Sequence, residues 1–105
     1  MRTTVSAVGG ATVVALEGSV DLAAVGALHG DLTRVVRRHP GASVIVDLDA
    51  IDALDDAGLG VLLGAAAALR ESGGDLEVVC NRPALRERLE RTRFDRAVKV
   101  RATIA

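Results

Sequence analysis

The spacing of hydrophobic positions along the chain changes between the compact runs typical of strands and the three-and-four spacing typical of helices. Runs rich in β-branched residues predict strands, and apolar positions three and four apart predict amphipathic helices. The expected strands cover residues 2–8, 12–16, 43–48, 76–80 and 98–100. The expected helices begin near Leu22, Ala57 and Pro83 and end near residues 36, 72 and 91.

Glycine and proline mark the ends of these elements. Gly9-Gly10 predicts a hairpin turn, His39-Pro40-Gly41 stops the first helix, and Gly73-Gly74 ends the second. After the hairpin, strands and helices alternate, which favours parallel strands joined by crossover helices. We therefore expect a single α/β domain over residues 1–105, with a four- to five-stranded mixed, mainly parallel sheet packed with amphipathic helices.

The apolar stripes also predict which side chains form the core. The continuous run Ser43–Leu48 indicates a central strand, covered on both faces or covered on one face and flanked by neighbouring strands. Leu22 heads the stripe of the first helix, and the loop from Gly18 to Asp21 precedes it. In the second helix we expect Leu62 and Leu63 both to face the core.

Composition narrows the function classes. No apolar run approaches the roughly 20 residues of a membrane span, and residues 1–6 lack the apolar segment of a secretory signal. The net charge is −1, and Phe94 is the only aromatic residue, so neither a global field nor a stacking platform favours nucleic acid. The lone Cys80 cannot form an internal disulfide. We expect a cytoplasmic protein that binds no nucleic acid and no membrane.

The segment Ile51–Leu63 carries the candidate functional chemistry, because an acidic turn leads directly into an amphipathic helix. A helix N-terminus exposes unpaired amides and partial positive charge, so Asp55 or Asp56 can cap it. Gly58 and Gly60 leave the first turn without bulky side chains, which permits close approach of a partner's backbone. The alternative interpretation is that Asp56 is only an N-cap and that the glycines only allow packing.

Other chemistries fit the residues less well. The carboxylates between Asp47 and Asp56 are of the type that binds divalent cations, but their spacing matches no known calcium loop. Cys80 has no local arrangement with His29 or His39 that makes a nucleophile and base. The late arginines alternate with acidic residues, which is typical of a solvated helix face. These observations disfavour an enzyme, a metal site and a cofactor.

The order of motifs resembles the STAS domain of anti-sigma-factor antagonists over nearly the whole chain. In that family a hydrophobic strand leads to an Asp-Ser-Ser/Thr-Gly-Leu-Gly-like turn before a helix, and here the turn is Asp55-Asp56-Ala57-Gly58-Leu59-Gly60. The segment Leu16–Asp21 is similar to the family's Leu-x-Gly-Glu-Leu-Asp, with Ser19 in place of the glutamate. Gly73-Gly74, the following strand and Pro83 agree with the same pattern.

This resemblance implies a protein-binding switch that docks on an anti-sigma factor of the histidine-kinase-like ATPase type and thereby frees a sigma factor for transcription. It implies no cofactor, metal, small-molecule substrate or catalytic residue. The implied partner-binding residues are Ser19, Asp21, Asp55, Asp56, Ala57, Gly58, Leu59 and Gly60. An alternative within the family is an accessory subunit of a lipid or ABC transporter, or of a stress-signalling assembly.

The chain departs from the family at the position that the partner kinase phosphorylates. The phosphoserine position is Asp56 here, and Ala57 follows it, so neither residue accepts phosphate from a serine kinase. Two opposite consequences stay open: Asp56 mimics the phosphorylated form and blocks docking, or the partner accepts it and the antagonist resists inactivation. A response-regulator receiver is the main rival fold, because Asp47 ends a strand, but the acidic pair and the late lysine of a receiver site are missing.

Overall fold

The computed structural model describes residues 1–104, so Ala105, the last residue of the predicted domain, lies outside the described residues. The described part of the chain contains a five-stranded sheet in which the strands follow the order β1-β2-β3-β4-β5. The strands are β1 (Arg2–Val8), β2 (Ala11–Val20), β3 (Ser43–Leu54), β4 (Asp75–Val79) and β5 (Val100–Arg101). β1 pairs antiparallel with β2, and the remaining pairs are parallel. The predicted mixed, mainly parallel sheet is confirmed.

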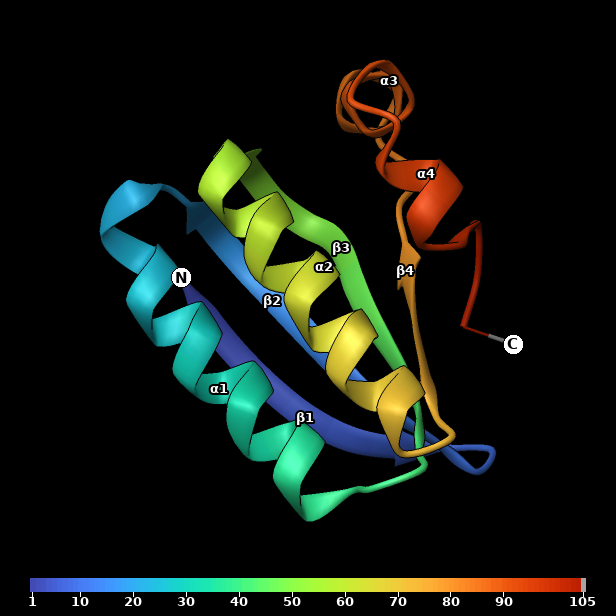
Figure 1. Cartoon of the computed structure of the whole chain (residues 1–105). Coiled ribbons are helices and arrows are strands. Elements are labelled where there is room, and N and C mark those ends of the chain that lie inside the picture. Colours follow the sequence, from blue (N-terminus) through green and yellow to red (C-terminus); the bar gives the residue numbers. More distant parts are fainter. Residues whose placement is uncertain (105) are drawn as a thin grey trace.

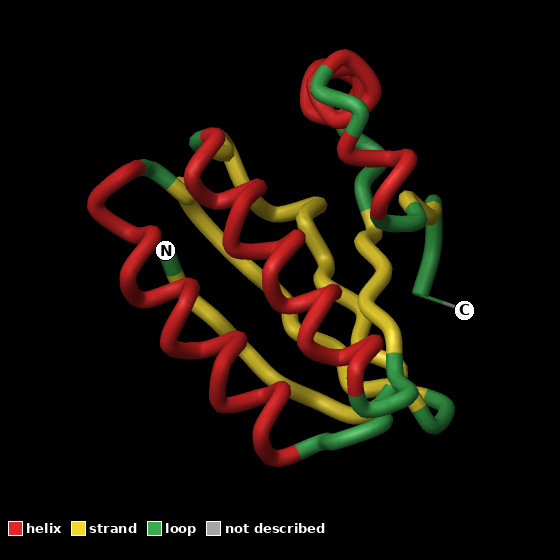
Figure 2. Tube along the Cα trace, in the orientation of Figure 1, coloured by secondary structure: helices red, strands yellow, loops and turns green. Residues whose placement is uncertain are grey.

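The two long helices lie side by side over the same face of the sheet (Figures 1 and 2). The helical segments are the 3₁₀ turn η1 (Leu22–Ala24), α1 (Val25–Arg38), α2 (Asp56–Glu71), α3 (Pro83–Arg91) and α4 (Phe94–Ala97). α1 joins β2 to β3 and α2 joins β3 to β4, as expected for parallel crossovers. α3 and α4 lie beyond the end of β4 (Figure 1).

The core lies between the sheet and these two helices. Alternate side chains of the central strands, such as Val14, Val46 and Leu48, are buried against Leu32 and Leu62 of the helices. The opposite sheet face carries a smaller apolar cluster of Val13, Ile45 and Val79, against which Ala11 and Ile104 pack. β3 is therefore covered by helices on one face and by the C-terminal segment on the other.

The two central strands are longer than the sequence pattern predicts. β2 runs to Val20 and β3 to Leu54, and these end residues are partners in the parallel ladder. The predicted loop at Gly18–Val20 is therefore wrong, and the strand predicted at 43–48 continues through the acidic stretch that follows it to Leu54. This part of the strand was missed because the exposed Asp49 and Asp52 interrupt the apolar run. Ile51 and Leu54 of the same segment are buried.

Smaller differences concern the ends of the helices and the last strand. The sequence predicts that Leu22 packs inward, but its side chain is 71% exposed. Leu22 lies in the 3₁₀ turn η1, which precedes α1, and not in α1 itself. Leu63 is also exposed, whereas its neighbour Leu62 is completely buried. Residues adjacent on a helix differ by about 100° in direction, so both could not face the same core. β5 begins at Val100, and the sequence pattern did not reveal α4.

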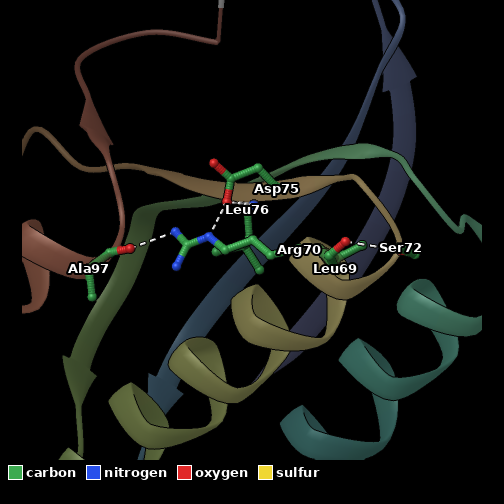
Figure 3. Close-up of polar contacts among 6 residues, drawn as sticks. All are labelled: Leu69, Arg70, Ser72, Asp75, Leu76 and Ala97. Atoms are coloured by element: carbon green, nitrogen blue, oxygen red, sulfur yellow. Dashed lines mark hydrogen bonds and ion pairs between the residues drawn. The ribbon is translucent and has the colours of Figure 1, made fainter.

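The C-terminus of α2 is tied to three neighbouring segments, and Figure 3 shows its contacts with two of them, β4 and α4. Arg70 Nε lies 2.8 Å from Asp75 Oδ1 at the start of β4, and Arg70 Nη2 donates to the Ala97 carbonyl oxygen at 2.6 Å. Ser72 Oγ donates to the Leu69 carbonyl oxygen at 3.0 Å and accepts from Gly41 N–H at 3.0 Å. These bonds fix the end of α2 against β4, α4 and the loop before β3.

Leu62→Ala and Leu63→Ala test the orientation of α2. The buried Leu62 leaves a cavity on truncation, so its variant should lose about 2–5 kcal/mol of unfolding free energy. The exposed Leu63 is the matched control and should lose less than about 1 kcal/mol. Chemical denaturation followed by circular dichroism measures both, and equal losses would show that α2 is rotated from the position described.

Candidate functional site

The acidic turn is held where the two longest strands end together. The Asp55 N–H donates to the Val20 carbonyl oxygen at 2.8 Å, continuing the ladder that pairs Val20 with Leu54. The chain leaves β2 into η1 at this edge and leaves β3 into α2 beside it. The carboxyl ends of parallel strands therefore bring residues 20–24 and 54–58 together, although more than 30 positions separate them in sequence.

Two aspartates cap the helical segments that begin here. Asp21 Oδ1 accepts from Ala24 N–H at 3.0 Å, and Asp55 Oδ1 accepts from Ala57 N–H at 2.8 Å. Both residues have the extended backbone of an N-cap. Of the two candidate caps for α2, Asp55 is the N-cap and Asp56 is the first helical residue. Asp21 and Asp55 thus have a structural role that accounts for their side chains.

Asp56 has a different environment. Its side chain is 84% exposed, and its Oδ1 lies 2.5 Å from Nη2 of Arg88 on α3. The Arg88 side chain is only 26% exposed, so the guanidinium is partly packed while the carboxylate faces solvent. The negative charge at the N-terminus of α2 is consequently matched by a positive charge from the same chain. An exposed pair of this kind adds little stability, but it sets the local charge.

The small residues of the turn divide between the interior and the surface. Gly58 is buried, and a Cβ there would lie 2.9 Å from Leu54 Cδ1 and 3.0 Å from Val20 Cγ1. Leu59 is also buried, so Gly58 and Leu59 support the turn from inside, and their contact with a partner stays a prediction. Ala57 and Gly60 are exposed, and a Cβ at Gly60 would meet nothing within 4 Å.

The exposed side of α2 forms a surface that we call the α2 face. Its members share small size or apolar character, apart from the acidic first residue: Asp56, Ala57, Gly60, Leu63 and Gly64. A groove of about 590 Å³ separates it from α1, where His29 and Arg37 contribute to the lining. A second groove of about 390 Å³ runs along its other side, next to Arg93 and Phe94. The α2 face is thus an apolar ridge between two grooves with basic side chains.

One exposed residue near this surface was missed by sequence reasoning. Leu22 follows the Asp21 cap at the same edge of the sheet and projects into solvent. Its place in the apolar stripe of the first helix hid this exposure, because nothing in the pattern distinguishes a 3₁₀ turn from a first helical turn. Ser19 is half-buried in β2 opposite Ala53 and is less accessible than Leu22.

The described residues form no assembled site for metal binding or for a cysteine nucleophile. Across residues 1–104 no three His, Cys, Asp or Glu side chains are grouped so as to hold a metal ion. Asp49 instead accepts from the backbone N–H and the side-chain amide of Asn81, at 2.7 and 2.9 Å. Burial raises the pKa of the Cys80 thiol, which opposes thiolate formation at neutral pH. None of the helices in this range is long and apolar enough to cross a membrane.

Comparison with known proteins assigns the fold to a family. The STAS domain family model matches residues 2–105. The chain therefore belongs to the STAS domain family. No significant match exists among curated proteins.

Solved structures agree with this assignment. An anti-sigma factor antagonist from Mycobacterium paratuberculosis is 28% identical, with a TM-score of 0.87 over 98% of this chain and 86% of that one. A substituted form of Moorella thermoacetica RsbS is 20% identical, with a TM-score of 0.77 over 99% and 89% of the two chains. The phosphorylated Bacillus cell fate determinant SpoIIAA is 18% identical, with a TM-score of 0.69 over 96% and 92%. At these identities the last two show the shared fold.

Asp55→Ala and Asp56→Ala separate the structural cap from the surface charge. Loss of the Asp55 cap leaves the Ala57 N–H without its partner and should cost about 0.5–2 kcal/mol of unfolding free energy. Loss of Asp56 removes only an exposed ion pair and should cost less than about 1 kcal/mol. Thermal and urea denaturation measure both variants. A larger loss for Asp56→Ala would contradict the assignment of Asp55 as the cap.

Proposed function

We propose that this STAS domain is an anti-sigma-factor antagonist that binds a histidine-kinase-like anti-sigma factor through the α2 face and Leu22. The observation that carries the proposal is the similarity to the Mycobacterium paratuberculosis antagonist, which extends over 98% of this chain at 28% identity. The docking surface lies at the turn where the resemblance to the family is most specific, Asp55–Gly60.

The physical character of this surface suits a protein partner. Leu22 and Leu63 are exposed apolar side chains, 71% and 38% accessible, and the exposed residues Ala57 and Gly60 of the turn are small. Burial of such side chains drives association, and the absence of large side chains at Ala57 and Gly60 lets a partner approach the helix closely. The flanking grooves add shape, and His29, Arg37 and Arg93 place basic groups along them.

Asp56 takes the place of the phosphorylated serine, and its pairing with Arg88 supports docking in the unmodified state. A phosphoserine adds about −1.5 to −2 charge and three acceptor oxygens. Asp56 carries one negative charge, and the Arg88 guanidinium matches it. With the Arg88 guanidinium included, the local net charge is about zero for Asp56, whereas a phosphoserine at the same position would bring it to about −0.5 to −1. We infer that Asp56 does not lock the antagonist off, and that a partner kinase cannot inactivate it at this position.

Affinity capture from the native host tests this function. Tagged wild type and Asp56→Ser should both enrich an ATPase with the histidine-kinase fold. Leu63→Asp should not, because it places a charge on the α2 face at an already exposed position. Val8→Asp, at a similarly exposed valine in β1, is the matched control and should retain capture. In the purified complex with ATP, only Asp56→Ser should incorporate phosphate and lose affinity.

Three other outcomes would each contradict a different part of the proposed function. Capture by Asp56→Ser alone would mean that Asp56 mimics the phosphorylated state despite Arg88. Absence of phosphate on Asp56→Ser in a verified complex would remove the match to the family phosphoserine position. Enrichment of a transporter ATPase in place of a kinase-like ATPase would reject the sigma-factor function and favour the accessory-subunit role.

A further inference from the structure

The strand β1 leaves a long edge of the sheet open. It lies at one end of the strand order and, in the part of the chain that the structure describes, pairs only with β2. All of its residues are exposed except Thr3, which is half-exposed, and Val5 and Val8 are 49% and 47% accessible. Figure 1 shows β1 running behind α1. An open edge of this kind is a template for pairing with another strand.

Most of the usual protections of an edge strand are missing from β1, whose only charged residue is Arg2 at its first position. Its seven residues contain no proline or lysine, and its register with β2 is continuous from Arg2 to Val8, without a bulge. The opposite edge of the sheet, by contrast, is protected, because β5 has only two residues. The register shifts of this sheet occur between β2 and β3, away from the β1 edge.

The hairpin turn determines which backbone groups face outward. Gly9 and Gly10 have φ of 55° and 84°, as in the common two-residue hairpin turn. The residues that flank such a turn, here Val8 and Ala11, form a hydrogen-bonded pair. Hydrogen-bonded and non-hydrogen-bonded pairs alternate along an antiparallel ladder. The inward-bonding residues of β1 are therefore Arg2, Thr4, Ser6 and Val8. The N–H and C=O groups of Thr3, Val5 and Ala7 are directed toward the open edge.

These outward groups are complementary to a second copy of themselves. An antiparallel partner strand centred on Val5 pairs Val5 with Val5, and Thr3 with Ala7 in both directions, which uses every outward N–H and C=O group. On the opposite face, Thr4 lies across from Ser6, and Arg2 across from Val8. This register places no like charges opposite each other, since Arg2 is the only charged residue of the strand. The net charge of −1 adds little repulsion between copies.

We propose that β1 is a self-association edge, along which a second copy of this chain adds antiparallel with Val5 on the two-fold axis. The two sheets join into one continuous sheet, and the exposed Val5 side chains contact each other. Val5 also lines a groove of about 360 Å³ with Ala27 and Asp31 of α1, so the partner's Val5 has space to pack. The proposal concerns an edge separate from the α2 face and does not depend on the proposed function.

The interface made by one strand pair is below the standard size of a stable complex, so association is expected to be weak and concentration-dependent. Sedimentation equilibrium of the wild type should show a rise from the monomer mass of 10.8 kDa toward twice that mass, with a dissociation constant of about 10–100 µM. A single monomeric species up to about 1 mM would overturn the proposal.

Charge variants test the register. Val5→Asp puts two carboxylates face to face on the axis, so dimer formation should fall at least about tenfold. Val5→Lys should do the same for two ammonium groups, and an equimolar mixture of the two variants should recover dimers as a heterodimer. Val8→Asp is the matched control, because its carboxylate lies opposite Arg2 of the other copy and should preserve the dimer. Unchanged dimerisation of Val5→Asp, or no recovery in the mixture, would overturn the register.

Cysteine variants test the axis independently. Two copies of Val5→Cys have Cα atoms about 5.5 Å apart in this register, within the range that a disulfide spans. Mild oxidation should therefore cross-link Val5→Cys, while Val8→Cys, whose two copies lie about 20 Å apart, should stay uncross-linked. The native Cys80 is buried and does not compete. Equal cross-linking of both variants would contradict the proposal. The Val5→Asp variant should still capture the anti-sigma factor. Loss of the dimer and failure of the proposed function can therefore be told apart.

Discussion

The parallel pairing of β2 with β3 is the constraint on which the rest of the structure depends. It continues to Val20 and Leu54 and ends with the bond from Asp55 N–H to the Val20 carbonyl oxygen. Both strands therefore stop at one edge, and the segments leading to α1 and α2 start there side by side. The two acidic caps, the exposed Leu22 and the start of the α2 face are neighbours for this reason. Gly58 belongs to the same constraint, because only a glycine fits between the ends of these two strands without displacing Leu54 or Val20.

The hydrophobic pattern predicted the fold well where burial alone decides the structure. The hairpin, the three main helices and the central strand follow from apolar spacing and from glycine and proline breaks, because these features are local. The hydrophobic pattern gave wrong predictions where buried and exposed side chains are close neighbours in the sequence. The predicted strand stops at Leu48 because an acidic stretch follows it, although Ile51 and Leu54 of that stretch are buried in β3. In the alanine-rich α2, the adjacent Leu62 and Leu63 satisfied the same stripe, and only packing shows which of them faces the core.

The candidate site was predictable in position but not in charge or exposure. The acidic turn at a helix start identified residues 55–60, and the resemblance to the family identified Asp56 within it. Nothing local indicates that Arg88, 32 positions away, pairs with Asp56, because α3 reaches the turn only through the fold. The same is true of Gly58 and Leu59, which face inward, and of Leu22, which faces outward. In the proposed function Asp56 acts through this tertiary pairing, because the Arg88 guanidinium balances the single charge of the carboxylate.

In the proposed complex, the α2 face and Leu22 contact the anti-sigma factor while the turn is unmodified. Hydrogen–deuterium exchange of the wild-type chain, alone and saturated with the captured ATPase, tests it directly. Binding should slow amide exchange in residues 20–24 and 55–64 and leave residues 43–48 and 75–79 unchanged. Slowed exchange confined to residues outside these two segments, or no complex without prior modification, would contradict it.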